Sequence, residues 1–180
     1  MTTEIINQIL AILTIASHFL LIVSVVLILF KKSKNFIINA LGRNGILLAL
    51  GIAIASTALS LFYSEIAGFE PCKLCWFQRI FMYPQIVLLG MAWFKKDFKI
   101  IDYALPLAII GGIIAIYHNY IYYGGISIFP CDASGLGISC ARRYVFEFGY
   151  VTIPLMSLTA FLLIIFFLGA QKSYNKLNRA

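Results

Sequence analysis

Five long, mostly apolar stretches constrain the fold of this chain more than any other feature. The first, residues 5–30, has 26 residues without a charged side chain, whereas a bilayer crossing needs about 20. The other four cover about residues 45–63, 71–94, 103–123 and 148–169. A backbone in lipid must satisfy its own hydrogen bonds, so each stretch is predicted to be a helix. We therefore expect an all-α integral membrane protein.

The composition supports this class and excludes most others. Hydrophobic residues make up 62% of the chain and charged residues 12%, about half of the roughly 25% usual in soluble domains. The net charge of +7 does not indicate nucleic-acid binding, because the basic residues lie between apolar stretches rather than on one soluble face. The sequence shows no repeat, nucleotide-binding loop or nucleic-acid module. A single membrane domain over residues 1–180 is expected.

The basic residues also predict the orientation. Ten of the 14 Lys and Arg residues fall in connections or ends that would share one side of the membrane, and such residues favour the cytoplasm. The N-terminus is therefore expected outside and the C-terminus inside. The first stretch is interpreted as a retained helix, because it exceeds the roughly 7–15 residues of a signal-peptide core and its positive residues follow it. The ten residues are Lys31, Lys32, Lys34, Arg43, Lys95, Lys96, Lys99, Lys172, Lys176 and Arg179.

A Cys-x-x-Cys motif at the outer start of the third stretch carries the candidate chemistry. If a helix begins at Pro71, then Cys72, Cys75 and Arg79 lie at i, i+3 and i+7 on one face. Both sulfurs then lie in the first turn, where the helix dipole favours a thiolate. This arrangement suits a reactive dithiol or a strained disulfide beside a fixed positive charge. A structural disulfide or half of a metal site is the alternative.

A second cysteine pair lies in the longest connection, residues 124–147, on the same predicted side. Four cysteines allow three pairings, and local spacing favours Cys72–Cys75 and Cys131–Cys140. The outer compartment permits disulfides. Two pairs on neighbouring loops suggest an electron relay by thiol–disulfide exchange. Purely structural disulfides are one alternative, and zinc held by four thiolates is another that the long second spacing disfavours.

Such a relay needs an electron acceptor, and the sequence offers no haem, flavin or nucleotide motif. A quinone in the bilayer fits, because the first cysteine pair lies at the membrane surface. Arg79, one turn below Cys75, would hydrogen-bond a quinone carbonyl and stabilise its reduced, anionic form. Trp76 and Phe77 would wall the ring, although for these aromatics alone anchoring at the lipid interface is the better explanation.

Two histidines and two groups of small residues add further expectations. His118 is on the same predicted side as the cysteines and is a candidate ligand for the acceptor. His18, in the middle of the first stretch, is equally well explained by packing. Small residues are frequent in 45–63, which predicts a central helix, and Gly111-Gly112 predicts a close helix contact.

Taken in order, these motifs resemble the signature of the quinone-linked thiol oxidases, the DsbB/BdbC family of disulfide-bond formation proteins, and its BdbC-type branch most closely. The resemblance covers about residues 40–170 and implies a four-helix transmembrane bundle, with residues 1–34 as an additional N-terminal helix. The matching motifs are Pro71-Cys72-Lys73-Leu74-Cys75-Trp76-Phe77-Gln78-Arg79, Phe81-Met82-Tyr83-Pro84, Tyr117-His118, the Cys131/Cys140 loop, and Gly149-Tyr150-Val151-Thr152-Ile153-Pro154.

The resemblance also implies an activity and its residues. A member of this family in the bacterial cytoplasmic (inner) membrane reoxidises a DsbA-like thioredoxin-fold partner and reduces a membrane quinone, either ubiquinone or menaquinone. Cys131 would form the mixed disulfide with the partner, and Cys140 would pair with it. Cys72 would attack the resulting loop disulfide. Cys75 would face the quinone together with Arg79.

Two departures from the family pattern and two alternative functions accompany this expectation. The helix over residues 5–30 lies outside the usual four, and packing or anchoring is its expected role. Gln78 stands where some members carry an acid, which weakens a proton-donor role there. One alternative is a quinone reductase resembling vitamin K epoxide reductase, with electrons running the other way. The other is a membrane scaffold or transporter with structural disulfides or bound metal.

Overall fold

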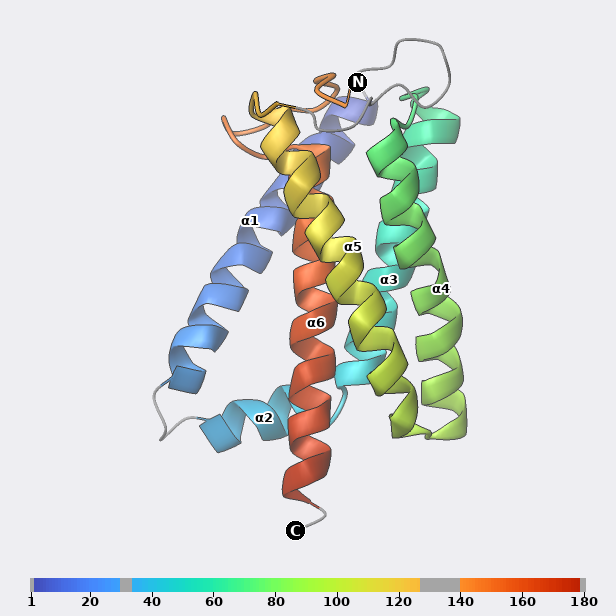
Figure 1. Cartoon of the computed structure of the whole chain (residues 1–180). Helices are drawn as coiled ribbons and strands as arrows, with labels where there is room; N and C mark the ends of the chain where they lie inside the picture. Colours follow the sequence, from blue (N-terminus) through green and yellow to red (C-terminus); the bar gives the residue numbers. More distant parts are fainter. Residues whose placement is uncertain (1, 30–33, 127–139, 179–180) are drawn as a thin grey trace.

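The computed structural model describes residues 2–29, 34–126 and 140–178, which form a helical bundle (Figure 1). Within these ranges the only β pairing is an isolated bridge between Glu147 and Val151. A π-helical turn, η1, extends the third helix, and a 3-10 turn, η2, leads into the fifth. In chain order the elements are α1 (Thr2–Leu29), α2 (Lys34–Gly42), α3 (Gly45–Leu61), η1 (Phe62–Ile66), α4 (Lys73–Lys95), η2 (Phe98–Ile100), α5 (Ile101–Tyr122) and α6 (Ile153–Leu177).

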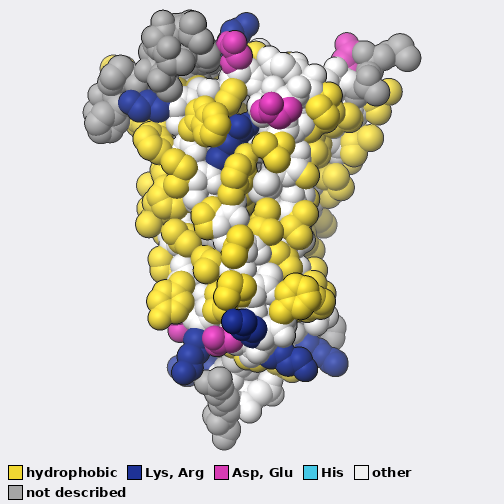
Figure 2. Space-filling view, turned by 90° about the vertical axis from the view of Figure 1, so that its right-hand side faces the viewer, with side chains coloured by type: hydrophobic (Ala, Val, Ile, Leu, Met, Phe, Trp, Pro, Cys, Tyr) yellow, Lys and Arg dark blue, Asp and Glu magenta, His cyan; other side chains and the backbone are white. Residues whose placement is uncertain are grey.

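The helices have the length and composition of membrane spans. Among the described residues, four segments are long and apolar enough to cross a bilayer: Thr3–Leu27, Gly45–Ile66, Phe98–Tyr122 and Ile153–Leu177. Helix α4 has 23 residues, about 34 Å at 1.5 Å per residue, and packs against α3 and α5, although polar side chains lower its hydropathy. Figure 2 shows a broad hydrophobic band bordered below by Lys and Arg side chains. The predicted all-α membrane fold is confirmed.

Helices α3, α4, α5 and α6 form a ring in which each packs against the next and α6 closes against α3. Helix α1 leans on α6 from outside the ring, and α2 crosses beneath, against α6 and α1 (Figure 1). The N-terminus and the start of α4 share one end of the bundle, which we call the cysteine end. The opposite end, where α4 passes into α5, carries Lys95, Lys96 and Lys99, and we call it the basic end.

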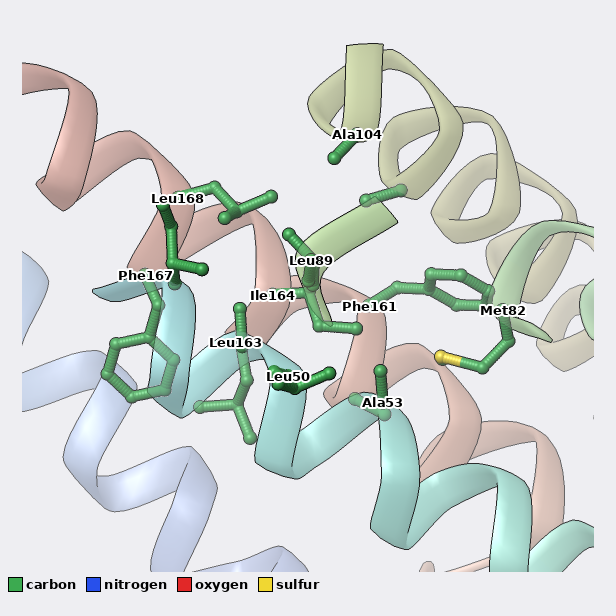
Figure 3. Close-up of a cluster of buried hydrophobic side chains, with 14 of the residues drawn as sticks. Leu50, Ala53, Met82, Leu89, Ala104, Phe161, Leu163, Ile164, Phe167 and Leu168 are labelled. Atoms are coloured by element: carbon green, nitrogen blue, oxygen red, sulfur yellow. The ribbon is translucent and has the colours of Figure 1, made fainter. Parts of the chain in front are cut away.

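The sequence predicted that the helix over residues 45–63 is central, and this is wrong. Helix α6 is central instead, because it contacts all five other α-helices. At the start of α3 a small residue permits close contact with α6: a Cβ at Gly45 would overlap the backbone carbonyl of Phe167. The predicted close contact at Gly111 is confirmed, since a Cβ there would overlap the ring of Phe161. Figure 3 shows Phe161 and Phe167 within the buried core.

Helix α6 begins later than the predicted residue 148. Phe148 and Gly149 have positive φ values of 50° and 78°, which reverse the chain before any helix can start. Thr152 then caps α6, its Oγ1 accepting a hydrogen bond from the backbone N–H of Leu155 at 3.2 Å. The helix therefore starts at Ile153, at the cysteine end of the bundle.

Candidate active site

The Cys-x-x-Cys pair lies where α4 begins. Cys72 has an extended backbone, with ψ of 171°, and is the N-cap, so the predicted helix start at Pro71 is wrong by two residues. The Sγ of Cys72 accepts a hydrogen bond from the backbone N–H of Cys75 at 3.4 Å. The two sulfurs are free thiols and lie 2.9 Å apart, within hydrogen-bonding distance. The pair is thus a dithiol at the start of the helix, which is one of the two forms that its spacing allowed.

His118 of α5 brings an imidazole to this pair. Its Nε2 lies 3.6 Å from the Sγ of Cys72 and 3.2 Å from the backbone oxygen of Cys140. The amide nitrogen of Gln78 lies 3.0 Å from the other ring nitrogen, Nδ1. Because an amide nitrogen only donates, Nδ1 is the acceptor and Nε2 carries the proton. The imidazole N–H is therefore directed at the Cys72 sulfur and the Cys140 carbonyl.

These contacts favour the thiolate of Cys72. The hydrogen bond with the Cys75 thiol is the largest influence and holds the pKa of the Cys72 thiol well below its ordinary value. Burial opposes this shift, and the hydrogen bond with His118 adds to it. Since the thiolate is the reactive form in disulfide exchange, Cys72 is the stronger nucleophile of this pair at neutral pH.

Arg79 supplies a buried positive charge on the same side of α4. Only 8% of this residue is exposed. Its Nε and Nη2 donate to the side-chain and backbone oxygens of Ser60 on α3, both at 2.9 Å, and its guanidinium lies 5.1 Å from the ring centroid of Trp76. In the described part of the chain no carboxylate forms an ion pair with it. Since Ser60 uses two of the five guanidinium N–H groups, the others are available to a ligand.

A cavity of about 410 Å³ joins these groups. Cys72, Cys75, Arg79 and His118 all line it, and its further walls are mainly apolar side chains of α1, α3 and α6. Small-molecule sites typically enclose about 300–1,000 Å³ and combine apolar walls with a few polar groups. The site therefore has the volume and the chemistry for an apolar ligand with a polar, electron-accepting head.

The remaining predicted site residues are placed differently. Trp76 and Phe77 are 51% and 42% exposed, and neither lines the cavity, although Trp76 touches Arg79. Cys140 is buried, is disulfide-bonded and packs in the same hydrophobic cluster as Cys72. Cys131 lies outside the described residues. The structure thus gathers five of the predicted residues around the cavity, because Cys140 lines it as well.

Two residues of the site were not predicted from the sequence as participants. Ser60 orients Arg79, yet a serine in an apolar stretch carries no pattern that would indicate this. Gln78 stood out only as a departure from the family motif, and its contact with His118 depends on how α4 packs against α5. Ligand atoms of Cys72, Cys75 and His118 also lie within 4.8 Å of one another, which is a spacing that a thiophilic ion such as zinc can use.

Comparison with known proteins identifies the family. The family model described as "Disulfide bond formation protein DsbB" matches residues 42–171 of this chain. The chain belongs to the DsbB family. The matched range holds α3, α4, α5 and most of α6, with all four cysteines, while α1 precedes it. The predicted family is confirmed, and with it the coarse function of a membrane disulfide oxidoreductase.

Individual relatives agree with the family assignment. The "Probable disulfide formation protein C 1" of Bacillus cereus is 45% identical over 117 residues, covering 64% of this chain and 83% of the relative. The "Disulfide bond formation protein C" of Bacillus subtilis is 44% identical over 124 residues, covering 67% and 87%. The "Probable disulfide formation protein" of Metapseudomonas resinovorans is 43% identical over 123 residues, covering 67% and 84%. No solved structure matches the chain.

Proposed function

We propose that this DsbB-family protein is a thiol:quinone oxidoreductase that reoxidises a DsbA-like thioredoxin-fold partner. The observation that carries the proposal is that a dithiol, an imidazole and a buried guanidinium line one mainly apolar cavity. Disulfide formation in the names of its relatives supports the thiol half of the reaction. The apolar walls and the unpaired charge of Arg79 support the quinone half.

The partner side of the cycle exchanges disulfides at the loop pair. A thiolate of the reduced partner attacks Cys131, the bond between Cys131 and Cys140 breaks, and Cys140 leaves as a thiolate. Cys140 then attacks Cys72 of an oxidised Cys72–Cys75 bond and releases Cys75. Electron flow towards the quinone requires this direction, the reverse of the attack by Cys72 that the family resemblance implied. The packing of Cys72 beside Cys140 supports this transfer.

The cycle then restores the loop and leaves a dithiol. The second partner thiol displaces Cys131 and completes the partner disulfide, and Cys131 displaces Cys72 from Cys140. The loop pair is again oxidised, while Cys72 and Cys75 hold the two electrons. A disulfide-bonded Cys140 beside free Cys72 and Cys75 is the combination found in the structure, which supports this intermediate.

The quinone side returns Cys72 and Cys75 to a disulfide. A bound quinone accepts two electrons and two protons and leaves as a quinol. Formation of the bond between the Cys72 and Cys75 sulfurs, which lie 2.9 Å apart, releases the two electrons; the Cys75 thiol gives up one of the two protons as its S–H bond breaks, and the other comes from solvent. Arg79 offers N–H donors to the oxygen on which negative charge develops. His118 holds the Cys72 thiolate until the bond closes.

We also propose the membrane and the orientation. The cysteine end faces the outside of the bacterial cytoplasmic membrane, where disulfides persist, and the C-terminus is cytoplasmic. The lysines of the basic end support this, because positive side chains favour the cytoplasmic face.

The proposal is tested with the full-length protein in lipid nanodiscs. A reduced DsbA-like protein and a benzoquinone carrying a decyl chain are added, and quinol and partner disulfide are measured together. We expect one quinol for each partner disulfide, loss of both with Cys75→Ser, and normal turnover with Ser173→Ala at the exposed basic end. Turnover that does not need Cys75 contradicts the mechanism. Electrons that run only from quinol to an oxidised partner would support the reductase alternative.

A further inference from the structure

Helix α1 contributes to the cavity although it lies outside the family match. The match begins at residue 42, whereas α1 ends at Leu29. Four α1 residues nevertheless line the cavity: Leu10, Leu13, Thr14 and Ser17. They lie at i, i+3, i+4 and i+7 and so share one helix face. We call this face the α1 wall.

Two side-chain hydrogen bonds fix α1 at positions that bracket the α1 wall. Before it, the Tyr63 hydroxyl of η1 donates to Oδ1 of Asn7 at 2.7 Å, and both residues are buried. After it, Nε2 of His18 lies 2.7 Å from Oγ1 of Thr159 on α6. Because Thr159 already donates its proton to the Leu155 carbonyl, it accepts from His18. Helix α1 is thus tied to both η1 and α6, at positions about three helical turns apart.

The α1 wall presents an apolar surface to the cavity despite its two hydroxyl groups. Thr14 donates to the backbone carbonyl of Leu10 at 2.7 Å, and Ser17 donates to that of Leu13 at 2.8 Å. Both hydroxyls are therefore satisfied within α1, and methyl and methylene groups are left to contact a ligand. This surface suits hydrocarbon rather than a polar head.

The ionisable side chains that line the cavity come from elements other than α1. Cys75 and Arg79 belong to α4, and His118 belongs to α5. When the polar head of a ligand reaches Arg79, its hydrocarbon part can therefore lie against the α1 wall. We propose that α1 forms the tail-binding wall of the quinone site and selects quinones by their side chain. This inference rests on the proposed thiol:quinone oxidoreductase activity, and it gives the additional helix a role in substrate binding.

The test compares two quinones with the same benzoquinone head, one without a side chain and one with a decyl chain. Leu10→Trp fills the α1 wall, whereas Ile9→Trp adds the same bulk at a position that is 52% exposed and does not line the cavity. With the full-length protein, we expect Leu10→Trp to raise the KM for the decyl quinone about tenfold, the equivalent of removing about two methylene groups from contact. The KM for the tail-less quinone and the kcat should change by less than about twofold, and Ile9→Trp should leave all values within that range.

A smaller change keeps the test valid if Leu10→Trp does not fold. Leu10→Ala removes contact from the α1 wall without adding bulk, and it should raise the KM for the decyl quinone about threefold or more while sparing the tail-less quinone. Equal effects of both Leu10 variants on both quinones, or equal effects of Leu10→Trp and Ile9→Trp, would overturn the inference. A wild-type protein that reduces neither quinone would instead refute the proposed function, so the two failures are distinct.

Discussion

Helices α3 and α6 meet in opposite ways at the two ends of the bundle. Towards the basic end, a Cβ added to Gly45, the first residue of α3, would overlap the Phe167 carbonyl of α6, and one added to Gly42, the last residue of α2, would lie 2.7 Å from the Ala170 oxygen. Backbones touch there, and no room is left for a ligand. Towards the cysteine end, both helices contribute walls to the cavity, from Ser60 on α3 and Thr159 on α6. The same helix pair is thus a tight contact at one end and a binding site at the other.

This difference means that the basic end mainly stabilises the bundle, whereas the cysteine end mainly supports activity. Close approach of backbones supplies van der Waals contact, which drives helix association in lipid. The cysteine end gives up some of this contact and is held instead by hydrogen bonds such as Arg79–Ser60 and Gln78–His118. Variants at the basic end should therefore change stability, and variants at the cysteine end should change turnover.

The largest effect is expected at the cysteine end, on replacing Arg79. Arg79→Gln removes the positive charge and most of the donors beside the cavity, and we expect kcat/KM for the quinone to fall about hundredfold, as for loss of a donor to a developing oxyanion. Steady-state kinetics with the quinone varied and the thiol partner saturating measure this. Arg43→Gln, an exposed arginine near the basic end, is the matched control and should be nearly neutral. A similar loss in both variants would contradict the proposed role of Arg79.

A smaller effect, on stability instead of turnover, is expected at the basic end. Gly45→Ala forces a Cβ against the α6 backbone and should destabilise the protein by about 1–3 kcal/mol, as overpacking does in other cores. Thermal denaturation in detergent measures it, and activity below the transition should be retained. Gly51 lies on the same helix with nothing within 4 Å of an added Cβ, so Gly51→Ala should not destabilise. Equal melting temperatures for the two variants would show that α3 and α6 can separate without cost.

The Cys72 thiol should show an unusual pH dependence. Because its pKa is lowered in the folded protein, its thiolate persists as the pH falls below about 8.5, the value of an ordinary thiol, and is lost only near the lowered pKa. Cys75→Ala removes the largest cause, so alkylation of Cys72 by iodoacetamide should slow about tenfold at a pH of about 6.5. His118→Leu should shift the profile in the same direction by less. Profiles that coincide with the wild type would show that neither neighbour stabilises the thiolate.

The smallest effect is expected for the ion pair between Lys172 and Asp102 at the basic end. Nζ of Lys172 lies 2.7 Å from Oδ1 of Asp102, but the two side chains are 60% and 58% exposed. Exposed pairs contribute at most about 1 kcal/mol and are screened by salt. Asp102→Asn should therefore leave the melting temperature and the turnover almost unchanged at moderate salt. A large loss of either would mean that surface charge, and not backbone contact, stabilises this end.

The sequence predicted the positions of the long helices well and their ends less well. The stretch 103–123 became α5, Ile101–Tyr122, because about twenty apolar residues have no other stable form in lipid. Helix α2 was not predicted, since its nine residues lie in a charged connection and depend on packing against α6. Helix α6 continues past the predicted end at Gly169 to Leu177, because backbone hydrogen bonding does not stop where hydropathy does.

The candidate site was also predicted only in part from the sequence. The register of Cys72, Cys75 and Arg79 follows from helical periodicity and was predicted. Contacts between helices, such as Arg79 with Ser60, depend on rotations and distances that one sequence pattern does not contain. The α1 wall is the clearest case, since the first stretch was expected only to pack or to anchor.

The cap of α4 makes its first turn sensitive to oxidation. The sulfur of Cys72 that accepts the amide proton of Cys75 is the same atom that forms and breaks bonds during the proposed cycle. Whenever that atom is bonded to Cys140, it no longer carries the thiolate charge and is a weaker acceptor for the Cys75 amide. The redox state of the sulfurs therefore changes the strength of a backbone hydrogen bond in the first turn of α4. Amide hydrogen exchange at Cys75 would then report the redox state without any label on sulfur.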